Sequence, residues 1–114
     1  MLIIGLDYID NFVIIIMDRL AEKLEIITKI KKEEFSYSDH GNIRALERSL
    51  PVSEIVHIAK HLIRWEWQEN IKTHLFIGPL TNGKGGGFSA VIRDDVIIVT
   101  VFRRKIKKWE KSDE

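Results

Sequence analysis

The sequence predicts a single α+β domain in which N-terminal helices pack on a roughly four-stranded antiparallel sheet. The first half of the chain carries apolar residues at helical intervals, whereas the second half changes to the two-residue period and β-branched composition of strands. Helices followed by antiparallel strands are typical of the α+β class. At 114 residues, with 45% hydrophobic and 31% charged residues, the chain has the length and composition of one globular domain.

The composition excludes several classes of chemistry. The sequence contains no cysteine, which rules out disulfides, thiolate catalysis and cysteine-ligated zinc and fits a reducing compartment. The isoleucine-rich N-terminus lacks a basic start and is interrupted by Asp7 and Asp10, so it does not match a signal peptide. A membrane span needs about 20 mostly apolar residues, and the sequence has no such run. We therefore expect a cytoplasmic domain without a membrane partner.

The first 37 residues predict a helix between two extended segments. Met1–Ile9 is apolar and partly alternating, which favours a short strand. Apolar spacing predicts a helix at least over Asp18–Lys31. The β-branched run Val13–Ile16 fits either a helix or a strand, so both interpretations stay open over residues 12–16. Glu33–Tyr37 is expected to be extended.

Two further helices are predicted before the chain changes period. Ser38 or Asp39 would cap a short helix that runs through Arg48, and Pro51 would end the run. Three apolar residues are expected on the inward face of this helix: Ile43, Leu46 and Leu50. The next helix would run from Ser53 to about Glu69. Its inward face would be closed at the C-terminal end by Trp65 or Trp67.

The second half of the chain predicts three strands, at His74–Leu80, Phe88–Ile92 and Val96–Phe102. The short link Arg93–Asp95 implies a tight antiparallel hairpin between the last two. The intervening segment Thr81–Gly87 holds four of the seven glycines and is expected to be a flexible loop.

One histidine and two arginines recur at intervals of four residues in the helix that follows Ser38. His40, Arg44 and Arg48 would therefore form a slowly drifting stripe on one helix face. An imidazole can transfer protons near neutral pH, and a guanidinium can hold a phosphate through two hydrogen bonds. Glu47 would orient an arginine or take a proton role itself. The alternative is a polar helix face with an incidental histidine.

Basic residues at two places in the second half could bind a polyanion. Five of them lie within six residues after the last strand: Arg103, Arg104, Lys105, Lys107 and Lys108. Such a cluster attracts nucleic acid, although it would also keep a strand edge soluble. Lys84, in the glycine-rich loop, adds a charge beside backbone amides that could approach an anion. We therefore predict nucleic-acid contacts from Lys84, Arg103, Arg104 and Lys105, against the alternatives of a mobile loop and a solvated tail.

Other candidate residues have simpler interpretations. His57 and His61 are four residues apart and could chelate a metal, but no third ligand is adjacent in sequence, so a solvated helix face is favoured. Trp65 and Trp67 are expected to pack, whereas Trp109, beside the basic cluster, could stack on a base. No metal or other cofactor is predicted.

The order of these features resembles a known group of domains. The run Phe35-Ser36-Tyr37-Ser38-Asp39-His40 precedes Arg44 and Glu47-Arg48, and the chain ends its apolar part with Ile97-Ile98-Val99-Thr100-Val101-Phe102. This is similar to the barnase, EndoU, colicin-tRNase and RelE superfamily of metal-independent ribonucleases. Their signature runs His-x-x-x-Arg, then Glu-Arg-Gly-Ile-Ser, and near the end Ile-x-Thr-Val-Tyr. The resemblance covers residues 35–102, about 60% of the chain.

This resemblance implies an active site on the face of a four-stranded antiparallel sheet. Matched residue by residue, His40 would be the acid or base, Arg44 and Arg48 would bind phosphate, and Thr100 would donate a hydrogen bond to a phosphate oxygen. Two departures stand out: the glycine after the second arginine is replaced by Ser49-Leu50-Pro51, and the closing aromatic is Phe102, which has no hydroxyl. Residues 1–34 would be an N-terminal extension, 35–102 the ribonuclease-toxin-like core and 103–114 a basic tail of one domain.

The sequence therefore predicts a metal-independent endoribonuclease or an RNA-binding domain. Cleavage would proceed by attack of the 2′-hydroxyl on the adjacent phosphate, leaving a 2′,3′-cyclic phosphate. The alternative is a non-enzymatic regulator, of the viral or mobile-element type, that binds an antitoxin, another protein or nucleic acid with the same fold. In that case the apolar N-terminus and the tryptophans would form a homodimer or partner surface.

Overall fold

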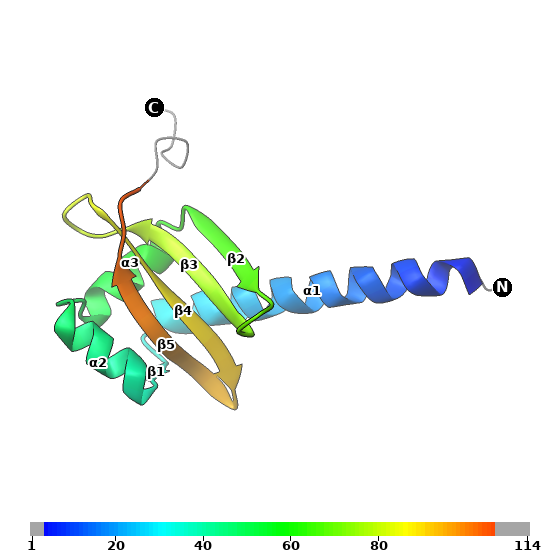
Figure 1. Cartoon of the computed structure of the whole chain (residues 1–114), viewed down its shortest axis with the longest axis horizontal. Coiled ribbons are helices and arrows are strands. Elements are labelled where there is room, and N and C mark those ends of the chain that lie inside the picture. Colours follow the sequence, from blue (N-terminus) through cyan, green and yellow to red (C-terminus); the bar gives the residue numbers. More distant parts are fainter. Residues whose placement is uncertain (1–3, 107–114) are drawn as a thin grey trace.

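The computed structural model of the chain describes residues 4–106 as three helices and a five-stranded sheet (Figure 1). The elements follow the order α1 (Ile4–Lys31), β1 (Ser36–Tyr37), α2 (Asp39–Glu47), α3 (Val52–Lys60), β2 (Arg64–Gln68), β3 (Thr73–Pro79), β4 (Gly85–Arg93) and β5 (Asp95–Arg103). The predicted α+β class is confirmed. None of the described helices combines the length and apolar character needed to cross a membrane.

The sheet has the strand order β1-β5-β4-β3-β2. Strands β2 to β5 form an antiparallel sheet through consecutive neighbours. Strands β3, β4 and β5 correspond to the three strands predicted in the second half, whereas β2 lies where a helix is predicted. Strands β4 and β5 are joined by the predicted hairpin, where Asp94 has a φ of 64°. The two-residue strand β1 lies within the segment Glu33–Tyr37 that is predicted to be extended, and it adds a fifth strand that pairs parallel to β5. The sheet is therefore mixed but mostly antiparallel.

Helix α1 occupies two environments. Its C-terminal half packs with α3 on one face of the sheet, where Ile26 and Ile30 are fully buried in the core. Its N-terminal half extends away from the rest of the molecule (Figure 1). The strand predicted over Met1–Ile9 is wrong from Ile4 onward, and residues 12–16 are helical. Helix propagation adds one hydrogen bond per residue, whereas a strand at this position would have no neighbour to pair with.

Helix α2 lies along the outer edge of β5, beyond the short strand β1 (Figure 1). The predicted cap is confirmed, because the Ser38 hydroxyl accepts a hydrogen bond of 3.0 Å from the backbone amide of Gly41. Leu50 is buried as expected, but Ile43 and Leu46 are each more than half exposed, so the predicted inward face is wrong. The helix approaches β5 most closely at Gly41, which is buried, and its small apolar residue Ala45 packs against the core.

Helix α3 is shorter than predicted, because it ends at Lys60 and the residues predicted to continue it form β2. Trp65 pairs with Phe76 and Trp67 with His74 across the ladder to β3. In a strand these two tryptophans share one face, which here is the face covered by α1. Trp65 packs against the core, as the packing interpretation expects.

The two faces of the sheet differ. Side chains that point toward α1 and α3 form the core and include Phe76, Phe88 and Val101, all fully buried. The opposite face carries the alternate residues, among them Ser89 and Thr100, which lie directly across from each other on β4 and β5. Among the described helices, none covers this second face, which we call the open face (Figure 1).

Candidate nucleic-acid interface

The predicted catalytic stripe is only partly assembled. On α2, the Arg44 Nε donates to the His40 Nε2 across 3.4 Å, and the Arg44 Nη1 forms an ion pair of 2.8 Å with the Glu47 Oε1. All three side chains reach the surface. The ion pair with Glu47 orients Arg44, which is the role predicted for Glu47. This group can offer an imidazole and one side of a guanidinium to a ligand.

Arg48 is engaged in holding the fold together. Its Nη1 donates a hydrogen bond of 2.5 Å to the backbone carbonyl of Val101 on β5. Arg103 reaches back from β5, and its Nε and Nη2 donate to the carbonyls of Arg48 and Ser49 at 3.0 and 3.2 Å. The hydrogen bonds of these two arginines therefore join the C-terminal end of α2 to the edge of β5. Carbonyls that a helix end and a strand edge would otherwise leave unpaired are satisfied by these contacts.

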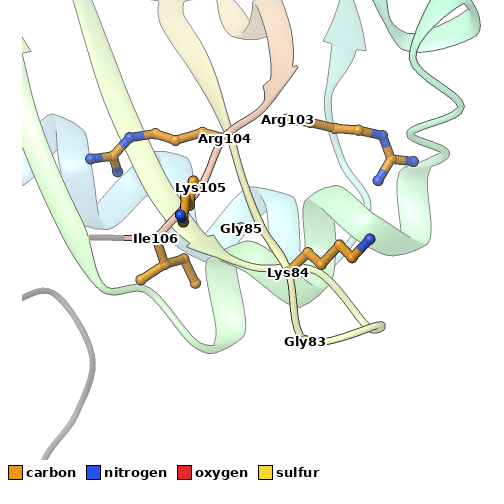
Figure 2. A pocket seen from close by; sticks show the side chains of 7 residues that line it. All are labelled: Gly83, Lys84, Gly85, Arg103, Arg104, Lys105 and Ile106. Carbon is orange, nitrogen blue, oxygen red and sulfur yellow. The ribbon is translucent and has the colours of Figure 1, made fainter. Parts of the chain in front are cut away.

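The four residues predicted to contact nucleic acid lie together around one hollow. Lys84, Arg103, Arg104 and Lys105 line a cavity of about 560 Å³ with the neighbouring residues Gly83, Gly85 and Ile106 (Figure 2). We call this the basic hollow. Figure 2 shows the Arg103 and Arg104 side chains leaving the end of β5 in opposite directions, with Lys105 between them. Lys107, Lys108 and Trp109, which the sequence also singles out, lie outside the described residues.

Local geometry brings the two basic segments together. The chain after β5 continues beside the start of β4, where the Arg104 amide donates to the Gly85 carbonyl at 3.0 Å. A Cβ on Gly85 would lie 2.2 Å from the Arg104 carbonyl oxygen, so this close approach needs a glycine. The glycine-rich segment predicted to be a loop is therefore a strand from Gly85 onward, and its glycines serve chain packing.

The turn that carries Lys84 is fixed at both ends. The Leu80 amide donates to the Lys84 carbonyl at 2.7 Å, and Gly83 has a φ of 86°, which favours glycine. The Thr81 amide and hydroxyl both donate to the Glu54 carboxylate, at 2.8 and 2.6 Å. The Thr81 hydrogen bonds lower the pKa of Glu54, and the positive charge of Arg103 lowers it further.

Thr100 lies in a second hollow on the open face. This hollow of about 450 Å³, which we call the sheet-face hollow, is lined by polar residues and by apolar ones. Its lining residues are Arg64, Gln68, Ile71, Leu75, Ile77, Ser89, Thr100, Phe102 and Arg104. Arg104 lines both hollows, so the two are adjacent. His40, Arg44 and Arg48 are absent from both linings, so the structure does not bring Thr100 together with the α2 stripe in one cavity.

The sequence interpretation missed the contribution of β2 to this hollow. Arg64 and Gln68 fall in a segment that the sequence predicts to be helical. In the structure this segment is β2, where they share a strand face with Glu66. The signal was present in the alternation Arg64-Trp65-Glu66-Trp67-Gln68, where polar and aromatic residues take turns. Ser89 was also missed, since its role depends on the cross-strand register that places it opposite Thr100.

A polar cluster around the buried His74 links α1 to the sheet on the other face. The His74 ring is 2% exposed, with its Nδ1 accepting from the Trp65 Nε1 at 3.0 Å and its Nε2 lying 2.8 Å from the Glu22 Oε1. Arg19 pairs with Glu22 at 3.1 Å and stacks over the Trp67 ring. Burial lowers the pKa of His74, although the Glu22 carboxylate opposes this effect. Because its ring nitrogens are both engaged inside the fold, His74 holds α1 in place.

His57 and His61 lie side by side, with ring centroids 4.5 Å apart. No group of three His, Cys, Asp or Glu side chains within residues 4–106 is arranged to hold a metal ion.

Comparison with known proteins adds no family assignment. No family model matches the sequence, and no curated protein or solved structure matches it.

Proposed function

We propose that this domain binds RNA through the basic hollow. The observation that carries the proposal is the gathering of Lys84, Arg103, Arg104 and Lys105 around one cavity. These residues come from two segments that are distant in sequence, and the strand pairing of β4 with β5 brings them together. Cations clustered in this way attract the phosphate backbone and release its counterions when it binds.

Salt dependence tests the proposal most directly. Wild-type protein should bind a labelled RNA with an affinity that falls linearly with salt on logarithmic axes. Lys84→Ala and Lys105→Ala should each weaken binding and lower the slope by about 0.7 per lost contact to a single strand. Arg93→Ala is the matched control, because Arg93 is exposed at the far end of β4. Equal losses in all three variants would contradict a localised site, and absence of binding by the wild type would refute the proposal.

Binding is better supported than cleavage because the residues assigned to catalysis are divided. Arg48 is engaged with the Val101 carbonyl, and Thr100 lies in a hollow that His40 does not line. Cleavage is a more specific proposal, and it rests on the surface group of His40, Arg44 and Glu47. His40 would remove the proton from the 2′-hydroxyl and that oxygen would attack phosphorus. The bond to the 5′-oxygen would then break as this leaving oxygen takes a proton from water.

Ribonuclease assays in EDTA separate binding from cleavage. We expect RNA binding that persists in His40→Ala, since this side chain lies outside the basic hollow. Cleavage to a 2′,3′-cyclic phosphate by the wild type, lost in a folded His40→Ala protein, would establish the enzymatic function. No cleavage by either protein would leave binding as the function.

A second candidate function is protein association through α1. Apolar side chains of its projecting part are exposed, including Val13, Met17, Leu20 and Leu24. Contiguous exposed apolar surface on a domain of this size marks an interaction site. This candidate corresponds to the non-enzymatic regulator and is compatible with RNA binding, because the basic hollow lies elsewhere on the molecule (Figures 1 and 2).

A further inference from the structure

We propose that the sheet-face hollow accepts an unpaired base of single-stranded RNA whose backbone follows the basic hollow. This inference rests on the proposed RNA-binding function and adds a substrate class, single-stranded rather than duplex RNA. Its cavity of about 450 Å³ falls in the range of small-molecule sites. It opens on the face of the sheet that α1 and α3 leave uncovered.

An aromatic ring, that of Phe102, lines one side of this hollow. Phe102 lies across Gly87 on the neighbouring strand, with its Cζ and Cε2 at 2.6 and 2.8 Å from the position that a Cβ on Gly87 would take. Only glycine permits this contact. The end of the ring therefore packs against Gly87 on β4, and the half-buried ring also lines the hollow. Unstacked bases of RNA bind to such rings by stacking.

Two hydroxyls at the floor of the hollow have unused hydrogen-bonding capacity. Ser89 and Thr100 are directly paired across β4 and β5, and Ser89 is only 3% exposed. Within the described residues, neither hydroxyl makes a hydrogen bond to the protein, and both can be reached from the hollow. A polar ligand in the hollow could therefore form hydrogen bonds with this pair of hydroxyls. Base edges and the ribose 2′-hydroxyl both offer donors and acceptors to it.

Arg104 connects the two hollows, since it lines both. An RNA backbone that follows the basic hollow past Lys105 and Arg104 would thus have a base within reach of the sheet-face hollow. Bases in a duplex are stacked and paired, so they could enter only after being pulled out of the helix. The arrangement therefore favours a single strand.

The test compares a short labelled RNA with its duplex of the same sequence. Wild-type protein should bind the single strand about tenfold more tightly, and a 2-aminopurine base within that strand should change fluorescence as it stacks. Phe102→Leu should reduce single-strand affinity by about tenfold and abolish the fluorescence change, while duplex affinity stays the same. Thr100→Val, which keeps the shape of the side chain and the strand propensity, should lower single-strand affinity to a smaller extent.

Ile97→Val serves as the control, because Ile97 is a half-buried residue of the same strand outside the lining of the hollow. Equal affinity of the wild type for single strand and duplex would overturn this inference and leave the proposed RNA binding intact. So would equal losses for both RNAs in Phe102→Leu and Thr100→Val. Binding to neither RNA would overturn the proposed function itself.

Discussion

At the scale of single residues, several charged and polar side chains serve the fold before they serve any ligand. Arg48 and Arg103 donate to backbone carbonyls at the junction of α2 and β5. The Ser38 hydroxyl caps α2 and also donates to the Val99 carbonyl at 3.1 Å. Arg103 is therefore both a structural residue and part of the basic hollow, and its replacement would test two properties together.

His74 makes the stability of the domain depend on pH. Its folded pKa is lowered by burial, so the unfolded chain binds a proton more readily than the folded one. This contribution to stability is complete above about pH 6.5, the value for an unfolded histidine, and falls as the pH drops toward the folded pKa. Protonation would also place an N–H at Nδ1, facing the N–H of Trp65.

Urea unfolding at a series of pH values measures this effect. The free energy of unfolding of the wild type should decrease as the pH falls below about 6.5. His74→Asn keeps an acceptor near the Nδ1 position and does not titrate, so it should lose this part of the pH dependence. An unchanged pH profile in that variant would assign the effect to another group.

At the scale of elements, α2 takes the place of a further strand at the edge of β5. Strand β1 pairs with only two residues of β5, and the side chains of Ser38 and Arg48, which cap the two ends of α2, then satisfy the Val99 and Val101 carbonyls. An uncovered strand edge would invite pairing with another chain. The close approach depends on Gly41, where a Cβ would lie 2.4 Å from the Ile98 carbonyl oxygen.

Replacing Gly41 with alanine should therefore destabilise the protein. Alanine normally stabilises a helix relative to glycine by up to about 1 kcal/mol, but here the added methyl group must push α2 away from β5. We expect a net loss of about 1–3 kcal/mol in the free energy of unfolding, as for other overpacked sites. Asn42→Ala is the control, since Asn42 is the next residue of α2 and is exposed. If Gly41→Ala were as stable as the wild type, the close contact would not govern docking of α2.

At the scale of the whole molecule, the packing of a single chain does not account for the exposed apolar residues on the projecting part of α1. Its exposed residues Val13, Met17, Leu20 and Leu24 follow the 4-3-4 spacing of a coiled-coil seam and are between 40% and 61% exposed. Helical stability in proteins comes mostly from packing of an apolar face, which this part of α1 lacks within one chain. Self-association along this seam would supply it.

Sedimentation equilibrium tests that expectation. The wild type should form a dimer or larger assembly, and the double variant Met17→Glu, Leu24→Glu should be monomeric because charges would enter the apolar seam. Thr28→Glu introduces the same charge at an exposed position of α1 outside the seam and should leave the assembly intact. A monomeric wild type would refute association through α1.

Local sequence patterns determined much of the architecture. The β-branched run Val96–Phe102, the short Arg93–Asp95 link and the Ser38 cap each act within a few residues, so the hairpin and the start of α2 could be predicted. The positions of basic residues in the sequence also indicated Lys84 and Arg103–Lys105 as candidate nucleic-acid contacts. Helix and strand periods are ambiguous over short segments, which is why Arg64–Gln68 was assigned to a helix.

Only the tertiary structure decided which candidates meet. Cross-strand register placed Ser89 beside Thr100 and brought Gly85 against Arg104, whereas packing of α2 on the edge of β5 engaged Arg48 and kept His40 out of both hollows. The sequence by itself determined the fold class and the charges available for binding an anion. Contacts between distant segments decided where those charges gather, because spacing along a chain specifies neighbours within an element and not across elements.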